Sequence, residues 1–97
     1  MLIAELHCYP SPVGDESGPY THVDAAIAVV AGSGLTYEVG PLGTTFEGPA
    51  DQVWATLRAA HEAALASGAD ANMTHVRLIE RPDSDATMGS LTAPHRP

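Results

Sequence analysis

The sequence predicts an α+β domain in which strands and helices follow one another in the order βαββαβ. Apolar residues alternate with other residues near the start of the chain and again near residue 76, as in half-buried strands. Two stretches between them carry apolar residues at helical spacing, and two short β-rich segments separate those stretches. Ninety-seven residues favour one core. Right-handed crossovers then place both helices on one face of a four-stranded antiparallel sheet, the ferredoxin-like arrangement.

The first half of the chain contains the first strand and the first helix. Residues 2–9 alternate, and a loop follows over residues 10–19 because three prolines and two glycines interrupt the strand. One face of the strand carries Leu2, Ala4, Leu6 and Cys8. We expect a helix to begin at Thr21 as its capping residue, with Asp24 near its positive end. The apolar stripe of this helix comprises Val23, Ala26, Ile27 and Val30.

A hairpin and a second helix occupy the middle of the chain. Segments 35–40 and 43–48 are rich in β-branched and aromatic residues and are joined at Pro41-Leu42, which predicts two strands around a tight turn. Pro49 suits the first turn of a helix that ends near Gly68. The predicted buried stripe of this helix comprises Val53, Leu57, Ala60 and Ala64.

A fourth strand closes the predicted domain. Residues 73–80 alternate again, so they complete the βαββαβ order. Residues 82–97 contain three prolines and little apolar periodicity. We therefore assign the domain to residues 1–81 and predict a C-terminal tail over 82–97.

Composition argues against several classes of partner. Twelve Asp and Glu residues stand against four Lys and Arg residues, giving a formal net charge of -8. This charge repels phosphate backbones and anionic membranes, so we expect no nucleic-acid or membrane partner, whereas a cationic small molecule is tolerated. No apolar run approaches the roughly 20 residues that span a bilayer. Cys8 is the only cysteine, which excludes a disulfide framework, favours core packing of its thiol and indicates a cytoplasmic protein.

Five histidines raise the question of a metal site. His7 and His75 become neighbours if the first and last strands pair, and Glu5 or Arg77 can join them on the open face of the sheet. No compact ligand motif such as His-x-x-x-His occurs, so a polar interface cluster is favoured and no metal ligand is assigned. The set Glu5, His7 and His75 is also the best clue to an alternative function, a small enzyme on a dimeric scaffold. No catalytic signature supports it, so no catalytic residue is assigned.

The hairpin carries the most informative polar residues. Alternation places Thr45 and Glu47 on one face of their strand, with Thr44 and Phe46 on the other. Tyr37 lies on the preceding strand. The hairpin therefore combines an aromatic ring, two hydroxyls and a carboxylate.

Four features of the chain are informative when taken together. They are the proline-rich exit from the first strand and three segments, namely Tyr20-Thr21-His22-Val23, Ser33-Gly34-Leu35-Thr36-Tyr37 and Gly43-Thr44-Thr45-Phe46-Glu47-Gly48. In these features the chain resembles the YkoF-like family of thiamine- and hydroxymethylpyrimidine-binding proteins. The similarity runs from Met1 to about Arg81. It implies ferredoxin-like protomers that associate through their sheets into dimers or tetramers and bind the vitamin, or its pyrimidine half, near subunit contacts.

The resemblance leads us to predict ligand contacts for the hairpin. The carboxylate of Glu47 can accept a hydrogen bond from the exocyclic amine of an aminopyrimidine, and the hydroxyls of Thr44 and Thr45 can donate or accept. Tyr37 can supply a flat face to the heterocycle and to a cationic thiazolium ring. Two structural alternatives remain open: Tyr37 as an ordinary core or interface residue, and Glu47 as a helix cap or a surface ion-pair partner.

The expected function is that of a homo-oligomeric cytoplasmic binder that buffers, senses or delivers thiamine or its hydroxymethylpyrimidine moiety. Thiamine is then a ligand and not a catalytic cofactor, and no cofactor is expected. The alternatives are the small enzyme described above and a structural or regulatory association module.

Overall fold

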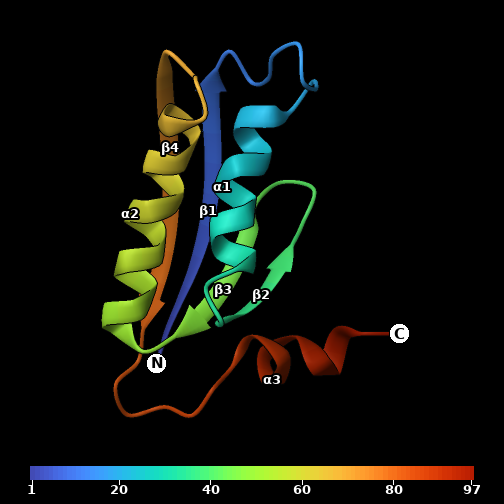
Figure 1. The fold of residues 1–97 in the computed structure, drawn as a ribbon. Coiled ribbons are helices and arrows are strands. Elements are labelled where there is room, and N and C mark those ends of the chain that lie inside the picture. Colours follow the sequence, from blue (N-terminus) through green and yellow to red (C-terminus); the bar gives the residue numbers. More distant parts are fainter.

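The computed structural model describes residues 1–97 and confirms the predicted architecture. The element order is β1 (Leu2–Ser11), α1 (Thr21–Ala31), β2 (Thr36–Val39), β3 (Thr44–Gly48), α2 (Ala50–Ala66), β4 (Ala71–Glu80) and α3 (Met88–Thr92), followed by a 3-10 turn (Ala93–His95). The strands form one antiparallel sheet in the order β2-β3-β1-β4. Helices α1 and α2 lie side by side on one face of this sheet (Figure 1). No helix is long and apolar enough to cross a bilayer.

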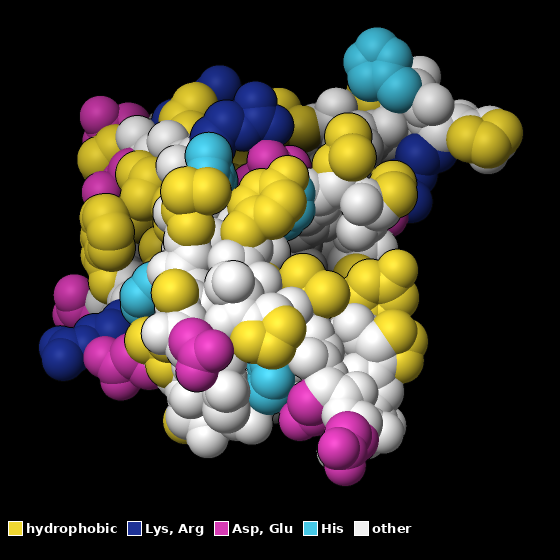
Figure 2. All heavy atoms as spheres, turned by 90° about the horizontal axis from the view of Figure 1, so that it is seen from above, with side chains coloured by type: hydrophobic (Ala, Val, Ile, Leu, Met, Phe, Trp, Pro, Cys, Tyr) yellow, Lys and Arg dark blue, Asp and Glu magenta, His cyan; other side chains and the backbone are white.

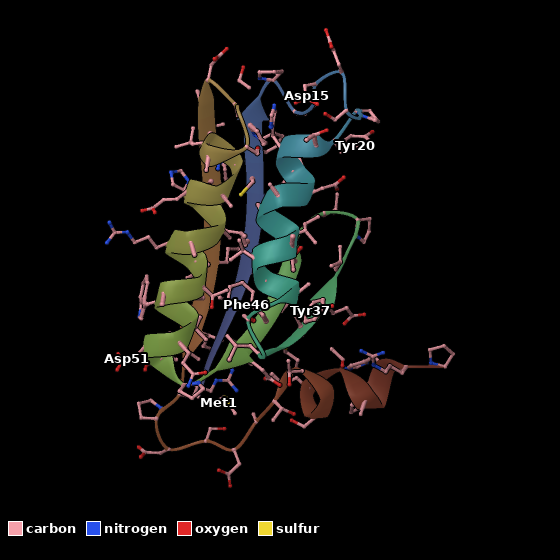
Figure 3. All side chains as sticks on the ribbon, viewed as in Figure 1. Met1, Asp15, Tyr20, Tyr37, Phe46 and Asp51 are labelled. Atoms are coloured by element: carbon pink, nitrogen blue, oxygen red, sulfur yellow. The ribbon has the colours of Figure 1, made fainter.

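The core lies between the sheet and the two helices. Alternate residues of β1 are buried as predicted, and Phe46 of β3 is fully buried beside them. Phe46 lies at the centre of the molecule, between the sheet and the helices (Figure 3). The buried cluster comprises Leu2, Ala4, Leu6, Cys8, Ala26, Val30, Phe46, Val53, Leu57 and Ala60. This set matches the predicted faces of β1 and α2 residue for residue, apart from Ala64, which is buried outside the cluster.

The start of α1 differs from the prediction. Tyr20, with φ of -129° and ψ of 24°, is the capping residue, and no side chain caps the helix. The prediction for Thr21 was wrong because its hydroxyl donates to the carbonyl of Gly18 at 3.1 Å, outside the helix. The buried stripe begins one residue earlier than predicted, at His22, while Val23 stays partly exposed.

His22 is buried because its ring has a partner on the other helix. Its Nδ1 hydrogen-bonds to Oγ of Ser67 at 2.6 Å, and that hydroxyl donates to the carbonyl of Ala64 at 2.8 Å. Gly68 follows with φ of +122°, a backbone conformation that favours glycine, and the chain turns there from α2 toward β4. The N-terminus of α1 is thus tied to the C-terminus of α2.

The segment predicted as a tail contains a short helix. Thr87 accepts a hydrogen bond from the backbone N–H of Ser90, and the hydroxyl of Ser90 accepts one from the N–H of Thr87, which forms a capping box for α3. In Figure 1 the helix lies below β2 and β3, and none of its residues is buried. It contacts β3 and β2 through Met88 and Arg96.

Candidate functional site

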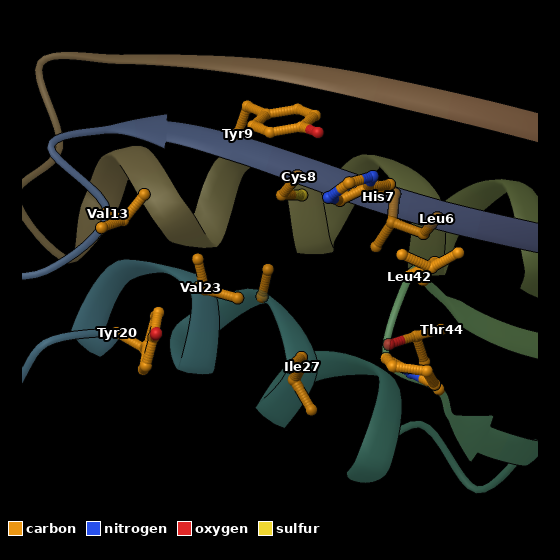
Figure 4. Close-up of a pocket in the computed structure, with 14 residues that line it drawn as sticks. Leu6, His7, Cys8, Tyr9, Val13, Tyr20, Val23, Ile27, Leu42 and Thr44 are labelled. Atoms are coloured by element: carbon orange, nitrogen blue, oxygen red, sulfur yellow. The ribbon is translucent and has the colours of Figure 1, made fainter.

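A cavity lies beside β1, next to the point where β3 begins at Thr44. The register of β1 with β3 ends at the pair Leu6 and Thr44, whereas β1 runs on to Ser11 with β4 as its only partner. The edge of β1 facing β3 is therefore without a strand partner from His7 onward. Helix α1 and the β2–β3 turn at residues 40–43 flank this edge and enclose a cavity of about 290 Å³ (Figure 4). The difference in strand length creates the cavity.

The lining of this cavity is mainly apolar, with a few polar groups. Aliphatic contacts come from β1, α1 and the turn, among them Leu6, Val23 and Leu42. Tyr20 and Thr44 supply hydroxyl groups, whereas His7 and Tyr9 border the cavity from β1 with side chains that alternation directs to the open face. The imidazole of His7 and the ring of Tyr9 lie 4.3 Å apart between centroids. An apolar concavity with a few polar groups is the usual form of a small-molecule site.

The loop between β1 and α1 forms one wall of the cavity through Val13 and Tyr20 (Figure 4). This loop is held in place by backbone contacts, since the carbonyl of Val13 accepts from the N–H of His22 at 3.1 Å. A β-bridge joins Asp15 and Gly18 inside the loop. Gly14 packs so tightly that a Cβ atom there would lie 2.3 Å from the carbonyl oxygen of Gly18. The wall is thus a closely packed loop.

Asp15 stabilises the same loop electrostatically. Its Oδ1 accepts a hydrogen bond from the N–H of Ser17 at 2.8 Å, and this bond is the main cause that lowers the pKa of the Asp15 carboxyl group. Its Oδ2 lies 3.8 Å from Nε2 of His22, at the buried end of α1. The carboxylate therefore bridges the loop and the first turn of the helix.

No charged Asp, Glu, Lys or Arg side chain lines the cavity. All four basic side chains of the chain are arginines, and they lie elsewhere. Arg58 pairs with Glu62 on α2, Arg77 pairs with Glu5 on the open face of the sheet, and Arg96 reaches β2. A phosphate group in the cavity would therefore find no cationic partner.

The four predicted ligand residues fall on two faces of the sheet. Thr44 pairs with Leu6 and Val39, points toward the helices, is buried and lines the cavity. Tyr37 pairs with Phe46 on the same face and is 42% exposed at the β2 edge, near the end of α1 opposite Tyr20 (Figure 3). It does not line the cavity.

Thr45 and Glu47 lie on the open face, as alternation predicted. Thr45 pairs with Glu5 of β1 and borders a shallow depression of about 260 Å³ on that face. Glu47 is only 7% exposed because the C-terminal segment covers it, and its Oε2 accepts the backbone N–H of Met88 at 2.8 Å. Within a single chain, Thr44 therefore borders the cavity beside β1 and Thr45 borders the depression on the open face. The carboxylate of Glu47 is already hydrogen-bonded to the C-terminal segment.

The predicted proximity of His7 and His75 is confirmed. They are direct partners in the β1–β4 register, and the ring of Tyr9 lies 6.0 Å from that of His75. Next to them Nη2 of Arg77 donates to Oε1 of Glu5 at 2.8 Å. No three His, Cys, Asp or Glu side chains gather closely enough to hold a metal ion.

Two features of the site were not predicted from the sequence. The first is the cavity wall formed by Val13 and Tyr20 of the proline- and glycine-rich loop. An apolar residue such as Val13 inside this loop was the only sequence signal for it. A polar cluster links α2 to β4, where Nδ1 of His61 hydrogen-bonds to Oγ1 of Thr74 at 2.6 Å. Nδ2 of Asn72 donates to the carbonyl of His61 at 3.0 Å. This cluster joins α2 to β4 next to the thiol of Cys8.

Comparison with known proteins finds relatives that match most of this chain. It is 37% identical over 87 residues to a UPF0045 protein of Synechocystis sp., covering 90% of this chain and 70% of that one. It is 31% identical to a UPF0045 protein of Methanothermobacter thermautotrophicus, over 88% of this chain and 86% of that one.

Solved structures agree on the fold. A domain of unknown function, DUF77, from Bacillus cereus superposes with a TM-score of 0.87 at 29% identity, covering 98% of this chain and 89% of that one. A Thermotoga maritima protein provisionally assigned to thiamine biosynthesis or salvage gives a TM-score of 0.81 at 18% identity, over 98% of each chain. The family model described as thiamine-binding protein matches residues 4–95. The chain therefore belongs to the thiamine-binding protein family, whose curated members here carry the name UPF0045.

Proposed function

We propose that this protein is a non-catalytic, homo-oligomeric binder of thiamine or of its hydroxymethylpyrimidine half, which buffers, senses or delivers the ligand in the cytoplasm. The observation that carries the proposal is the match of the thiamine-binding family model to nearly the whole chain. The cavity beside β1 supplies a physical site for such a ligand. Its volume of about 290 Å³ lies at the small end of ligand pockets, about 300–1,000 Å³, and suits one small heterocycle better than a dinucleotide.

The chemistry of the cavity fits a flat, weakly polar or cationic ligand. Tyr20 offers an aromatic face, which attracts a thiazolium cation by about 0.5–2 kcal/mol. The hydroxyl of Thr44 can donate to a ring nitrogen or accept from an exocyclic amine. Because no arginine lines the cavity, we expect free thiamine and the pyrimidine alcohol to bind more tightly than their phosphate esters.

The predicted hairpin residues take different parts in this proposal. Thr44 is the one that borders the cavity within a single chain. Thr45 and Glu47 would contact a ligand only in a site that a second copy completes on the open face, and Glu47 would first have to lose its bond to Met88. Tyr37 lies on the helix face and outside the cavity, so it would contact a ligand only at the β2 edge. Thr44 therefore defines the first test.

Calorimetric titration of the intact protein with thiamine, hydroxymethylpyrimidine and thiamine diphosphate tests the proposal. We expect heat and a raised melting temperature with the first two ligands and weaker binding of the diphosphate. The absence of heat and of a thermal shift at millimolar concentrations of all three would refute it. Recovery of the ligand unchanged after prolonged incubation is the result expected of a binder and not of an enzyme.

A matched pair of variants locates the site. Thr44→Val and Thr45→Val each replace one hydroxyl by a methyl group on adjacent residues that face opposite sides of β3. If the cavity beside β1 binds the pyrimidine, Thr44→Val weakens binding by about tenfold, the worth of one hydrogen bond of ~1 kcal/mol or somewhat more. Thr45→Val then binds as wild type. The reverse order would reject the cavity and favour the open face.

A further inference from the structure

The main chain of β1 bonds alternately to its two neighbouring strands. In an antiparallel sheet the N–H and carbonyl of one residue point to the same neighbour, and those of the next residue point to the other. The N–H of Arg81 donates to the carbonyl of Met1 at 3.4 Å, and these two residues continue the β1–β4 register. Odd-numbered residues of β1 therefore bond to β4, and even-numbered residues point toward β3.

The β2–β3 hairpin leads to the same assignment independently. The N–H of Gly40 donates to the carbonyl of Gly43 at 2.9 Å, and this pair continues the β2–β3 register. Because Gly43 bonds to β2, residues 44, 46 and 48 bond to β1. Their partners there are the even-numbered residues Leu6, Ala4 and Leu2.

Cys8 is the next even-numbered residue, and no strand lies opposite its main chain. Leu42, which would face it, lies in the β2–β3 turn and forms no main-chain hydrogen bond with it. The side-chain hydrogen bonds at this residue are those of its thiol, to Thr74 and Asn72. Cys8 is buried and lines the cavity. One N–H and one carbonyl therefore face the cavity without a partner from the chain.

Pro10 limits how far this free edge of β1 extends. It is the following even-numbered residue, and proline has no N–H. The free edge thus offers a single donor, at Cys8, whereas a paired strand needs a donor at every second residue. A small ring that carries an acceptor next to a donor matches this edge better than a peptide strand does.

We propose that the main chain of Cys8 recognises the aminopyrimidine ring. Its N–H donates to the ring nitrogen next to the amine, and its carbonyl accepts one hydrogen of that amine. The amine carries a second hydrogen, which the hydroxyl of Thr44 can accept across the same cavity (Figure 4). This recognition rests on the proposed function and adds to it the group that selects an amine beside a ring nitrogen.

The surroundings of the edge suit an uncharged ring. Figure 2 looks onto the end of the molecule that carries the β1–α1 loop, and it shows a hollow bordered by hydrophobic and histidine side chains. In such surroundings a main-chain group left without a hydrogen bond is costly. A ring that lacks the amine would leave the carbonyl of Cys8 in that state, so the edge discriminates between rings by their hydrogen-bonding groups.

Hydrogen exchange of the intact protein, followed by NMR, tests the free main-chain pair. Leu6 is the matched control, because it lies on the same strand with the same parity and pairs with Thr44. In the free protein we expect the amide of Cys8 to exchange far faster than that of Leu6. Equal protection of the two amides would overturn the assignment of a free pair.

Saturation with hydroxymethylpyrimidine tests the contact itself. The exchange of the Cys8 amide should slow much more than that of Leu6, because the ring nitrogen then accepts its hydrogen. Binding of the pyrimidine with unchanged exchange at Cys8 would overturn the contact and leave the proposed function standing. Failure of every ligand to bind would refute the proposed function, and the contact with it.

Removal of the amine tests the bond to the carbonyl. The 4-desamino pyrimidine should bind about 100-fold more weakly than the parent, the worth of two hydrogen bonds. The 2-desmethyl pyrimidine also lacks one heavy atom but keeps the amine, so it should bind within about fivefold of the parent. Equal affinity of the two analogues would overturn the proposal.

Thr44→Val separates the two acceptors of the amine. In this variant the carbonyl of Cys8 is the acceptor that remains, so removal of the amine should weaken binding by about tenfold in place of about 100-fold. If removal of the amine costs nothing in Thr44→Val, the hydroxyl of Thr44 alone holds the amine. That result would overturn the role of the main chain.

Discussion

Replacing Gly14 by alanine tests whether the loop between β1 and α1 builds the ligand cavity. The added Cβ would lie 2.3 Å from the carbonyl oxygen of Gly18 and equally close to the carbonyl carbon of Pro19. Non-bonded heavy atoms prefer separations of about 3.5–4.0 Å, so the backbone must move by roughly 1.2 Å or more. Overpacking of this kind costs about 1–3 kcal/mol. We therefore expect the loop to leave its native position while the core stays intact.

The effect on binding follows from the same strain. The wall formed by Val13 and Tyr20 is present only while the loop holds its native conformation. A strain of about 1–3 kcal/mol lowers the population of that conformation by up to about 5- to 150-fold. If the native loop is then no longer the dominant state, the apparent Kd for thiamine rises by the same factor. Calorimetric titration measures Kd, and far-ultraviolet circular dichroism checks that helix and strand content persist.

A second glycine in the same loop supplies the control. A Cβ atom at Gly18 would meet only the hydroxyl oxygen of Thr21 at 3.3 Å, and a side-chain hydroxyl can rotate away. Gly18→Ala should therefore keep wild-type affinity within a few-fold. If Gly14→Ala binds thiamine as tightly as Gly18→Ala, the loop does not form the wall of the site.

Three further predictions concern stability and the C-terminal segment. Phe46→Ala should lower the free energy of unfolding, measured in urea, by about 3–5 kcal/mol because the ring is fully buried. Tyr37→Ala, at the exposed edge, should lower it far less, and equal losses would contradict the core assignment. Asp15→Asn should destabilise the protein at pH 7. Because the folded pKa of Asp15 lies below its ordinary value of 3.8, that difference should shrink as the pH falls through the folded pKa, and a difference that does not shrink in acid would refute the electrostatic explanation. Glu47→Gln should speed amide hydrogen exchange at Met88 by weakening a charge-assisted hydrogen bond, and an unchanged rate would show that this bond does not hold the segment.

The helices and strands were predictable because the residue pattern that indicates each one lies within the element itself. The alternation of Leu2, Ala4 and Leu6 and the stripe that begins at Val53 each lie within one element, and the structure confirms both. The face of Glu47 also followed from alternation, since a residue's side of a strand depends only on its position. Right-handed crossover then sufficed to put both helices on one face of the sheet.

Features that depend on distant partners were not predictable in this way. His22 is buried because Ser67 meets its ring from a residue 45 positions away. Glu47 is covered because Met88, 41 positions away, donates its N–H to the carboxylate. The capping prediction for Thr21 failed for a related reason, because the preceding loop turns back and its Gly18 carbonyl takes the hydroxyl proton. In each case a residue with ordinary local propensity found a partner that spacing does not encode.

The lengths of the strands explain where the candidate site lies. β1 and β4 are both ten residues long and pair throughout, whereas the β2–β3 hairpin covers only the first half of β1. The shortfall on the hairpin side opens the cavity next to Thr44. The full pairing on the other side leaves β4 as a long regular edge. Starting β3 earlier than Thr44 would thus fill the cavity and leave the pairing of β1 with β4 unaltered.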